Sequence, residues 1–132
     1  MITKALILLI DDDPLIHELL SSTLSKHGHK VVSVNNAEDA KRWLATGCPD
    51  LILMDIILPD INGLDLCRWV RDQGRFKNVP IIVSTALTDE GTSRESSEVG
   101  AIDIITKPIN FALLTKKIQS ALEASDLKNP KS

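Results

Sequence analysis

Carboxylate, hydroxyl and ammonium side chains follow four short apolar runs of this sequence. Three aspartates, Asp11–Asp13, come directly after the first run, and Asp55 follows the third. Ser84–Thr85 and Thr106–Lys107 come after the fourth and fifth runs. Carboxylates that are brought together repel one another unless a cation lies among them, and Mg²⁺ is a hard cation that accepts carboxylate and phosphate oxygens. These residue types indicate phosphoryl chemistry, in which one carboxylate is the nucleophile and forms an acyl phosphate.

The polar side chains can act together only if the apolar runs fold so that their ends lie close to one another. Each run is continuous rather than alternating, as expected for strands that are buried on both faces. Amphipathic segments separate the runs, so the pattern predicts an α/β fold, a (βα)5 doubly wound parallel five-stranded sheet. Ligands of such a sheet bind beyond the carboxyl ends of its strands, which is where the polar groups fall. The predicted strands are Leu6–Ile10, Val31–Val34, Leu51–Met54, Ile81–Val83 and Ile102–Ile105.

Cap residues and helical spacing predict the helices between these strands. Gly28 follows the first helix as a stop signal, and Asn36 and Asn110 are suited to cap the second and the last helix. The segment 89–99 has almost no apolar stripe, so the fourth helix is expected to be short or mobile. The first four predicted helices cover about residues 15–24, 37–46, 63–73 and 89–99, and the fifth begins after Asn110.

The composition limits the classes of protein to consider. The chain has 132 residues, which is the size of one domain, and we expect residues 1–124 to form it. Residues 125–132 are polar and read as a flexible tail or the start of a linker. The net charge of −3 argues against direct nucleic acid binding. Aromatic residues make up 3% of the chain with no Tyr, so a base-stacking platform is not expected.

The cysteines and the apolar N-terminal run indicate a cytoplasmic protein. Cys48 and Cys67 form neither a C-x-x-C pair nor a disulfide framework. The run Ala5–Ile10 is too short for the core of a signal peptide and far too short to cross a bilayer. We therefore expect reduced thiols, a cytoplasmic location and no membrane partner.

Four motifs, in this order and each at the end of a predicted strand, resemble those of response regulator receiver domains of two-component signal transduction systems. The resemblance spans about Lys4 to Ala124 and implies a flavodoxin-like fold with strand order 2-1-3-4-5. The motifs are Ile10-Asp11-Asp12-Asp13-Pro14, Met54-Asp55-Ile56-Ile57-Leu58-Pro59-Asp60-Ile61-Asn62-Gly63, Ser84-Thr85-Ala86 and Thr106-Lys107-Pro108.

This resemblance implies the phosphoacceptor and the ligands of a metal ion. Asp55 is the phosphoacceptor and also a ligand of Mg²⁺. Asp11 and Asp12 form the acidic pair, in which Asp12 is the direct Mg²⁺ ligand and Asp11 acts largely through bound water. The backbone carbonyl of Ile57 completes the metal site.

The remaining motif residues are implied to grip the phosphoryl group and to shape the loops. Thr85 is the switch hydroxyl, and Lys107 bonds the phosphoryl group or the aspartate. The Lys107–Pro108 peptide bond is expected to be cis. Asp13 has no direct role in the family and is expected to cap the first helix. Further switch or structural positions are Pro59, Gly63 and Ala86.

The sequence departs from the family pattern at the position that relays the signal. Many receivers carry Tyr or Phe three residues before the lysine, whereas this chain has Ile104. An aliphatic relay is expected, with Thr85–Ile104 as the mobile output face. The residues two positions past Asp55 and Thr85 are Ile57 and Leu87, which are both apolar and cannot position an attacking water. We expect slow self-dephosphorylation.

The resemblance also implies what this protein binds. A sensor histidine kinase or a phosphotransfer protein would donate the phosphoryl group, docking near the first helix and the Asp55 loop. The fourth helix, fifth strand and fifth helix are a candidate homodimer interface. The protein would catalyse only its own phosphorylation and dephosphorylation, so it would not be an enzyme with a separate substrate.

Two other functions remain open on the sequence. A small Mg²⁺-dependent phosphatase that forms an aspartyl phosphate usually has a second acid two residues after the nucleophile, where this chain has Ile57. A receiver-like binding module that is never phosphorylated would lack the acceptor or the lysine, and both are present here. Aspartates after a strand can also be simple helix caps, which is a plain alternative for Asp11–Asp13 but not for Asp55, whose helix starts several residues later.

Overall fold

Strands and helices alternate along residues 4–86 and 90–128, which are the residues that the computed structural model describes. The strands are β1 (Leu6–Ile10), β2 (Lys30–Val34), β3 (Leu51–Asp55), β4 (Ile81–Thr85) and β5 (Asp103–Thr106). The helices are α1 (Pro14–Lys26), α2 (Ala37–Leu44), α3 (Gly63–Asp72), α4 (Glu90–Glu98) and α5 (Phe111–Lys128). The predicted order of five strand–helix units is therefore confirmed.

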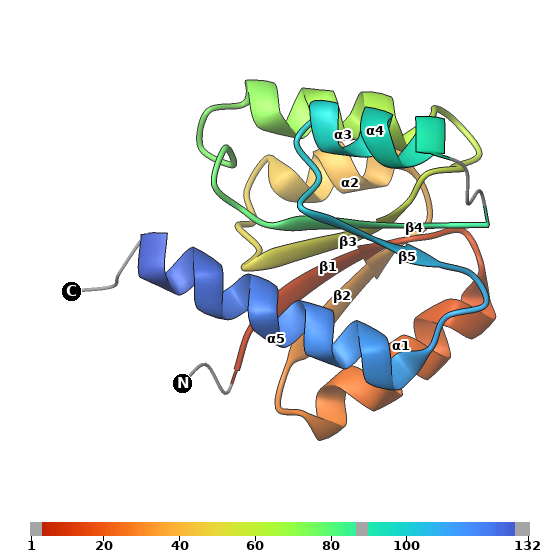
Figure 1. Cartoon of the computed structure of the whole chain (residues 1–132), viewed down its shortest axis with the longest axis vertical. Helices are drawn as coiled ribbons and strands as arrows, with labels where there is room; N and C mark the ends of the chain where they lie inside the picture. Colours follow the sequence, from red (N-terminus) through yellow and green to blue (C-terminus); the bar gives the residue numbers. More distant parts are fainter. Residues whose placement is uncertain (1–3, 87–89, 129–132) are drawn as a thin grey trace.

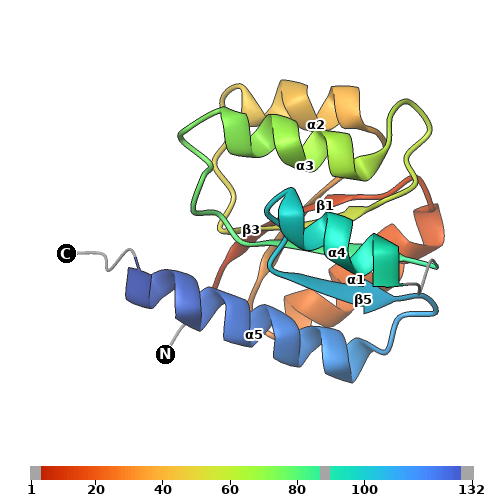
Figure 2. The same ribbon diagram turned by 45° about the horizontal axis from the view of Figure 1, so that its top comes forward.

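The strands form one parallel sheet in the order β2-β1-β3-β4-β5. Helices α2, α3 and α4 cover one face of this sheet and α1 and α5 cover the other, as Figures 1 and 2 show. The α/β fold and the strand order 2-1-3-4-5 are those expected. The carboxyl ends of the strands are in register, since Asp55 pairs with Ser84 and Thr85 with Thr106.

Two apolar cores lie on the two faces of the sheet. Successive strand side chains point to opposite faces, so Leu8 and Ile10 join the core under α2 and α3, while Ile7 and Leu9 join the core under α1 and α5. All five residues of β3 are buried. Burial on both faces is the physical reason why the strand sequences are continuously apolar.

The helix caps follow the predictions. The Asp13 carboxylate accepts a hydrogen bond from the Leu15 amide at 2.9 Å, with Pro14 as the first helical residue. The side chain of Asn36 caps α2, and Asn110 accepts from the Leu113 amide at 3.0 Å. Such caps satisfy backbone donors that a helix cannot satisfy internally.

Several element boundaries differ from the prediction. Strands β3 and β4 continue to Asp55 and Thr85, because backbone pairing continues whatever the polarity of the side chain. Ile102 precedes β5 and is 53% exposed, so its assignment to a strand was wrong. Helix α2 ends at Leu44, two residues before the predicted end. Helix α5 continues to Lys128, past the expected domain boundary.

The fourth helix is short, as its sequence predicts. It has nine residues, and Ser96 is its buried residue among the described side chains. Its expected mobility stays a prediction. Among residues 4–86 and 90–128, no helix combines the length and the apolar character that crossing a bilayer requires.

One buried polar atom lies at the start of β2, far from the polar strand ends. His29 is 7% exposed, and in the described part of the chain its Nδ1 has no hydrogen-bond partner. Burial lowers the pKa of His29 below its ordinary value, and the neighbouring His27 lowers it further. A buried nitrogen without a hydrogen-bond partner lowers the free energy of unfolding. Since the pKa of His29 differs between the folded and unfolded states, the free energy of unfolding also depends on pH.

We expect stability to fall as the pH drops below about 6.5, the ordinary pKa of histidine. The unfolded chain then takes up the proton, whereas folded His29 resists protonation until its own lower pKa is reached. His29→Leu is expected to make the free energy of unfolding nearly independent of pH between about pH 7.5 and 5.5. It is also expected to raise the free energy of unfolding by about 1 kcal/mol. Urea unfolding at both pH values measures this. The exposed-ring control His27→Gln should keep most of the slope, and an unchanged slope in His29→Leu would contradict the prediction.

Candidate functional site

Three aspartates from two strand ends meet at the carboxyl edge of the sheet. Asp11 and Asp12 directly follow β1, and Asp55 is the last residue of β3. One carboxylate oxygen from each lies within 4.8 Å of the others. Asp11 and Asp55 are buried, while Asp12 is exposed. Adjacent parallel strands thus bring together the acids that the sequence places 43 or more positions apart.

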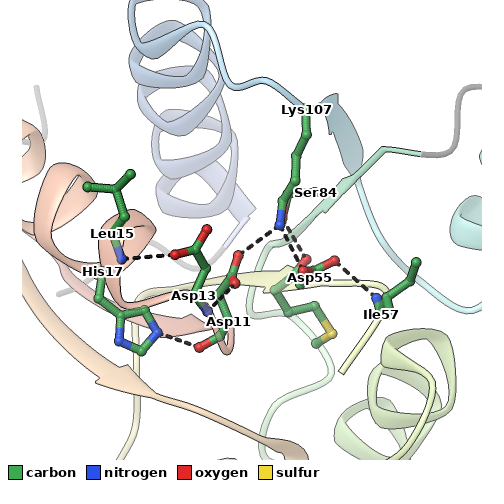
Figure 3. A network of polar contacts seen from close by, with 9 residues as sticks. Asp11, Asp13, Leu15, His17, Asp55, Ile57, Ser84 and Lys107 are labelled. Carbon is green, nitrogen blue, oxygen red and sulfur yellow. Dashed lines mark hydrogen bonds and ion pairs between the residues drawn. The ribbon is translucent and has the colours of Figure 1, made fainter. Parts of the chain in front are cut away.

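Lys107 reaches this acidic cluster from the loop after β5. Its Nζ donates to Asp55 Oδ2 at 2.8 Å and to Asp11 Oδ2 at 3.2 Å, as Figure 3 shows. The Lys107 amide donates to the Thr85 carbonyl at 2.8 Å, which ties the lysine to the end of β4. The Lys107–Pro108 peptide bond is cis, as the resemblance implies. One ammonium group thus bridges the carboxylates of β1 and β3.

The charges in this cluster shift the pKa values of its members. Burial raises the pKa of Asp11 above its ordinary value, and the Asp13 amide and Lys107 only partly offset this. Burial alone would lower the pKa of Lys107, but its bond to Asp55 and the charges of Asp11 and Asp55 outweigh burial and raise it. The ammonium form is therefore favoured, while the cluster still holds more acid than one lysine can neutralise.

The loop after Asp55 folds back onto this residue. The Ile57 amide donates to Asp55 Oδ1 at 3.0 Å, so both carboxylate oxygens of Asp55 accept a hydrogen bond. The Ile57 side chain is 60% exposed, and Pro59 is also exposed. Gly63, which begins α3, is buried and packs against the backbone of Asp55 and Ile56. The small residue permits this close approach.

The remaining predicted switch residues lie on β4 and β5. Thr85 is fully buried at the end of β4, and Ala86 after it is exposed. Ile104 is half-buried on β5 and packs against the core under α2 and α3. Leu87, expected to shield the site, lies outside the described residues.

Asp60 is a structural link that the sequence analysis missed. Its two carboxylate oxygens accept from the Ala37 amide at 3.0 Å and the Glu38 amide at 2.9 Å, at the start of α2. Burial raises the pKa of Asp60, but its backbone hydrogen bonds, including those from Ala37 and Glu38, together outweigh burial and lower the pKa. The loop after Asp55 is thereby tied to the second helix. Asn36 satisfies only part of the free amides there, which is a weak signal that another acceptor is needed.

The donor set fits a hard divalent cation. Carboxylate oxygens, together with a backbone carbonyl, are the ligands that Mg²⁺ accepts in proteins. The clustering of Asp11, Asp12 and Asp55 supplies these oxygens, and a bound cation would relieve the repulsion among the three carboxylates. The soft ligands Cys48 and Cys67 are not part of this cluster. The triad is therefore a candidate metal site of the kind typical of Mg²⁺-binding receivers.

The fold and this site define a class of protein, and the sequence comparison agrees. Residues 7–119 match the family described as the response regulator receiver domain, and the chain belongs to this family. The chain is 40% identical over 116 residues to the transcriptional regulatory protein GltR of Pseudomonas aeruginosa, covering 88% of this chain and 48% of GltR. The chain spans about half the length of the first curated relatives.

Shorter relatives match over nearly their full length. Protein PilH of Pseudomonas aeruginosa is 33% identical over 118 residues, which covers 89% of this chain and 98% of PilH. A putative response regulator from Chloroflexus aurantiacus superposes with a TM-score of 0.86 at 30% identity, covering 91% of this chain and 98% of that structure. Sequence and structure thus place the chain in the same family.

Proposed function

We propose that this chain is a phosphoaccepting signalling switch in which Asp55 takes a phosphoryl group from a histidine kinase or a phosphotransfer protein. The observation that carries this proposal is the arrangement around Asp55. Lys107 Nζ lies 2.8 Å from Asp55 Oδ2. Oxygens of Asp11 and Asp12 lie within 4.8 Å of an Asp55 oxygen. A nucleophile, a cation and a candidate metal site thus share one edge of the sheet.

The proposed reaction needs little chemistry from the protein. An Asp55 carboxylate oxygen attacks the phosphorus, the bond from phosphorus to the donor nitrogen breaks, and the imidazole leaves with that electron pair. Lys107 then donates to the phosphorylated aspartate, and Thr85 offers its hydroxyl. Mg²⁺, when held by Asp11, Asp12, Asp55 and the Ile57 carbonyl, supplies positive charge for the phosphoryl oxygens. Catalysis of this kind is mainly positioning and charge neutralisation.

We propose the same output face as the sequence predicts, from Thr85 to Ile104. The buried Thr85 and the half-buried Ile104 support it, since they lie on the paired neighbouring strands β4 and β5. The side chain that relays the change would be the aliphatic Ile104 rather than an aromatic residue. Hydrogen exchange with and without a phosphoryl mimic tests this, and equal protection in both states would count against it.

The proposed partners dock on two different surfaces. Exposed apolar side chains on α1 and on the loop after Asp55 suit the phosphoryl donor, namely Leu15, Leu19 and Ile57. A homodimer through α4, β5 and α5 stays a prediction, and Leu113 on α5 and Ile102 just before β5 are exposed apolar residues there. A cytoplasmic location, the lack of direct nucleic acid binding and the lack of turnover on a separate substrate belong to this proposal too.

One experiment separates the proposed function from its alternatives. The protein is incubated with a small phosphodonor, with Mg²⁺ or with a chelator, and the intact mass and the released phosphate are followed in time. A stable adduct of one phosphoryl group that requires Mg²⁺ supports the switch. Rapid phosphate release with turnover supports a phosphatase, and no adduct under either condition supports a binding module.

We expect the phosphorylated protein to decay slowly, because the apolar Ile57 cannot hold a water for attack. Ile57→Asn adds an amide that can. One hydrogen bond is worth about 0.5–1.5 kcal/mol. Decay is therefore expected to become about 2–10-fold faster. Loss of the adduct mass in time measures this. Ile102→Asn, the same change at a similarly exposed position just before β5, should leave the rate unchanged, and equal or slower decay in Ile57→Asn would contradict the prediction.

A further inference from the structure

A histidine on the first turn of α1 contacts the backbone of the acidic loop. The imidazole Nε2 of His17 is in hydrogen-bond contact with the carbonyl oxygen of Asp11, six residues earlier. Figure 3 shows the ring turned toward this carbonyl, on the side away from Lys107. Since a carbonyl oxygen can only accept, Nε2 carries the proton and donates it. The Asp11 carbonyl belongs to the peptide group that joins Asp11 and Asp12. The hydrogen bond from His17 therefore fixes the orientation of the peptide plane directly before Asp12.

Hydrogen bonds from the same loop hold the other side of Asp12. The Asp13 amide donates to Asp11 Oδ1 at 2.9 Å. The Asp13 carbonyl accepts from the His17 amide at 3.2 Å. His17 therefore bonds both the peptide group before Asp12 and the carbonyl of the residue after it. A single residue of α1 thus contacts the backbone of the acidic loop both before and after Asp12.

Asp12 needs such support from the backbone. Its carboxylate is exposed, whereas those of Asp11 and Asp55 are buried, so neighbouring side chains do not pack it into place. An exposed aspartate is positioned mainly by its own backbone, and a metal ligand binds tightly only where its oxygen is pre-positioned. The peptide plane that His17 holds is thus one of the constraints on this oxygen.

We propose that His17 is a positioning residue for the metal site and fixes the backbone that presents Asp12 to Mg²⁺. This inference rests on the metal site of the proposed function. Among the described residues, the clustered ligand atoms belong to Asp11, Asp12 and Asp55, so His17 is assigned a supporting role through its bond to the Asp11 carbonyl. Its contribution is that of a supporting hydrogen bond, whose loss commonly weakens metal binding by about tenfold or more.

A matched pair of substitutions separates the hydrogen bond from the bulk of the side chain. His17→Gln places an amide N–H about where Nε2–H lies, whereas His17→Met has similar length but no donor. Titration calorimetry with MgCl₂ alone measures the affinity of the native chain and of both variants. We expect His17→Met to bind about tenfold more weakly and His17→Gln to bind within about threefold of the native chain. His27→Met, at the far end of α1 and exposed, is the control and should bind normally.

A second measurement covers the case in which His17→Met is poorly folded. In the metal-free proteins, the backbone amide resonances of Asp12 and Asp13 should shift in His17→Met and stay near their native positions in His17→Gln. Native-like affinity and native-like resonances in His17→Met would overturn the inference and leave the proposed function intact. Weak binding by His17→Gln and His17→Met alike would overturn it as well, since the donor would then not matter. If the native chain binds no Mg²⁺, the metal site of the proposed function is wrong, and the inference fails with it.

Discussion

Asp55→Asn is expected to abolish the phosphoryl adduct while leaving the protein folded. The carboxylate is the proposed nucleophile, and a neutral amide cannot form the acyl phosphate. Asparagine keeps the size of the side chain and an oxygen that can still accept from the Ile57 amide, a bond of 3.0 Å in the native chain. The substitution loses the bond to Lys107 but also relieves repulsion with Asp11. We therefore expect the melting temperature to change by only a few degrees.

Intact mass after incubation with Mg²⁺ and a small phosphodonor measures this result. Asp65→Asn is a matched control, because Asp65 is exposed on α3 and, among the described residues, its side chain pairs with the surface residue Arg68 at 3.1 Å. This control should take up the phosphoryl group to the native extent. An adduct of native extent in Asp55→Asn would show that another carboxylate is the acceptor, and the proposed role of Asp55 would then be wrong.

Gly63→Ala is expected to produce the largest loss of stability, about 3 kcal/mol or more. An added Cβ would lie 2.8 Å from the Ile56 Cα and closer still to the Asp55 carbonyl oxygen. Both are backbone atoms, which cannot rotate away as the end of a flexible side chain can. Either the start of α3 or the phosphoacceptor itself must therefore move, so a reduced extent of phosphorylation should accompany the lost stability.

Urea unfolding followed by the fluorescence of Trp43 and Trp69 measures the free energy of this change. Gly74→Ala is the matched control, since it has φ of +68° but nothing within 4 Å of an added Cβ. Gly74→Ala should lower the free energy of unfolding only by the cost of a left-handed backbone at alanine, which is about 1–2 kcal/mol. At this chain length, the Gly63→Ala loss corresponds to a melting temperature lower by roughly 10 °C. A Gly63→Ala variant as stable as Gly74→Ala would contradict the steric argument.

The alternation of strands and helices and most of the site could be predicted from local patterns, whereas the strand order was implied by the resemblance to receiver domains. Leu51–Met54 is continuously apolar, and Asp55 ends that run with no helix cap to explain it. Lys107 follows another run in the same way. Parallel strands point their carboxyl ends to one edge, so these two side chains were expected to meet, and they lie 2.8 Å apart.

The strand ends and the supporting contacts could not be predicted in this way. Apolar runs underestimate the length of β4, since Thr85 pairs through its backbone whatever its side chain. Ile102 looked like part of a strand but is exposed before β5. Asp60 and His17 bond backbone amides and a backbone carbonyl, and a backbone partner leaves no complementary residue in the sequence.

The amino-acid sequence alone therefore specifies which residues carry charge to the sheet edge, because hydrophobic burial forces the apolar runs inward and leaves Asp11, Asp55 and Lys107 at their ends. It does not specify how those groups are held. That depends on distances between segments brought together by folding, such as the Asp60 bonds to α2 and the His17 bond to the acidic loop. Hydrogen bonds are short and directional, so only packed tertiary structure determines which donors and acceptors meet.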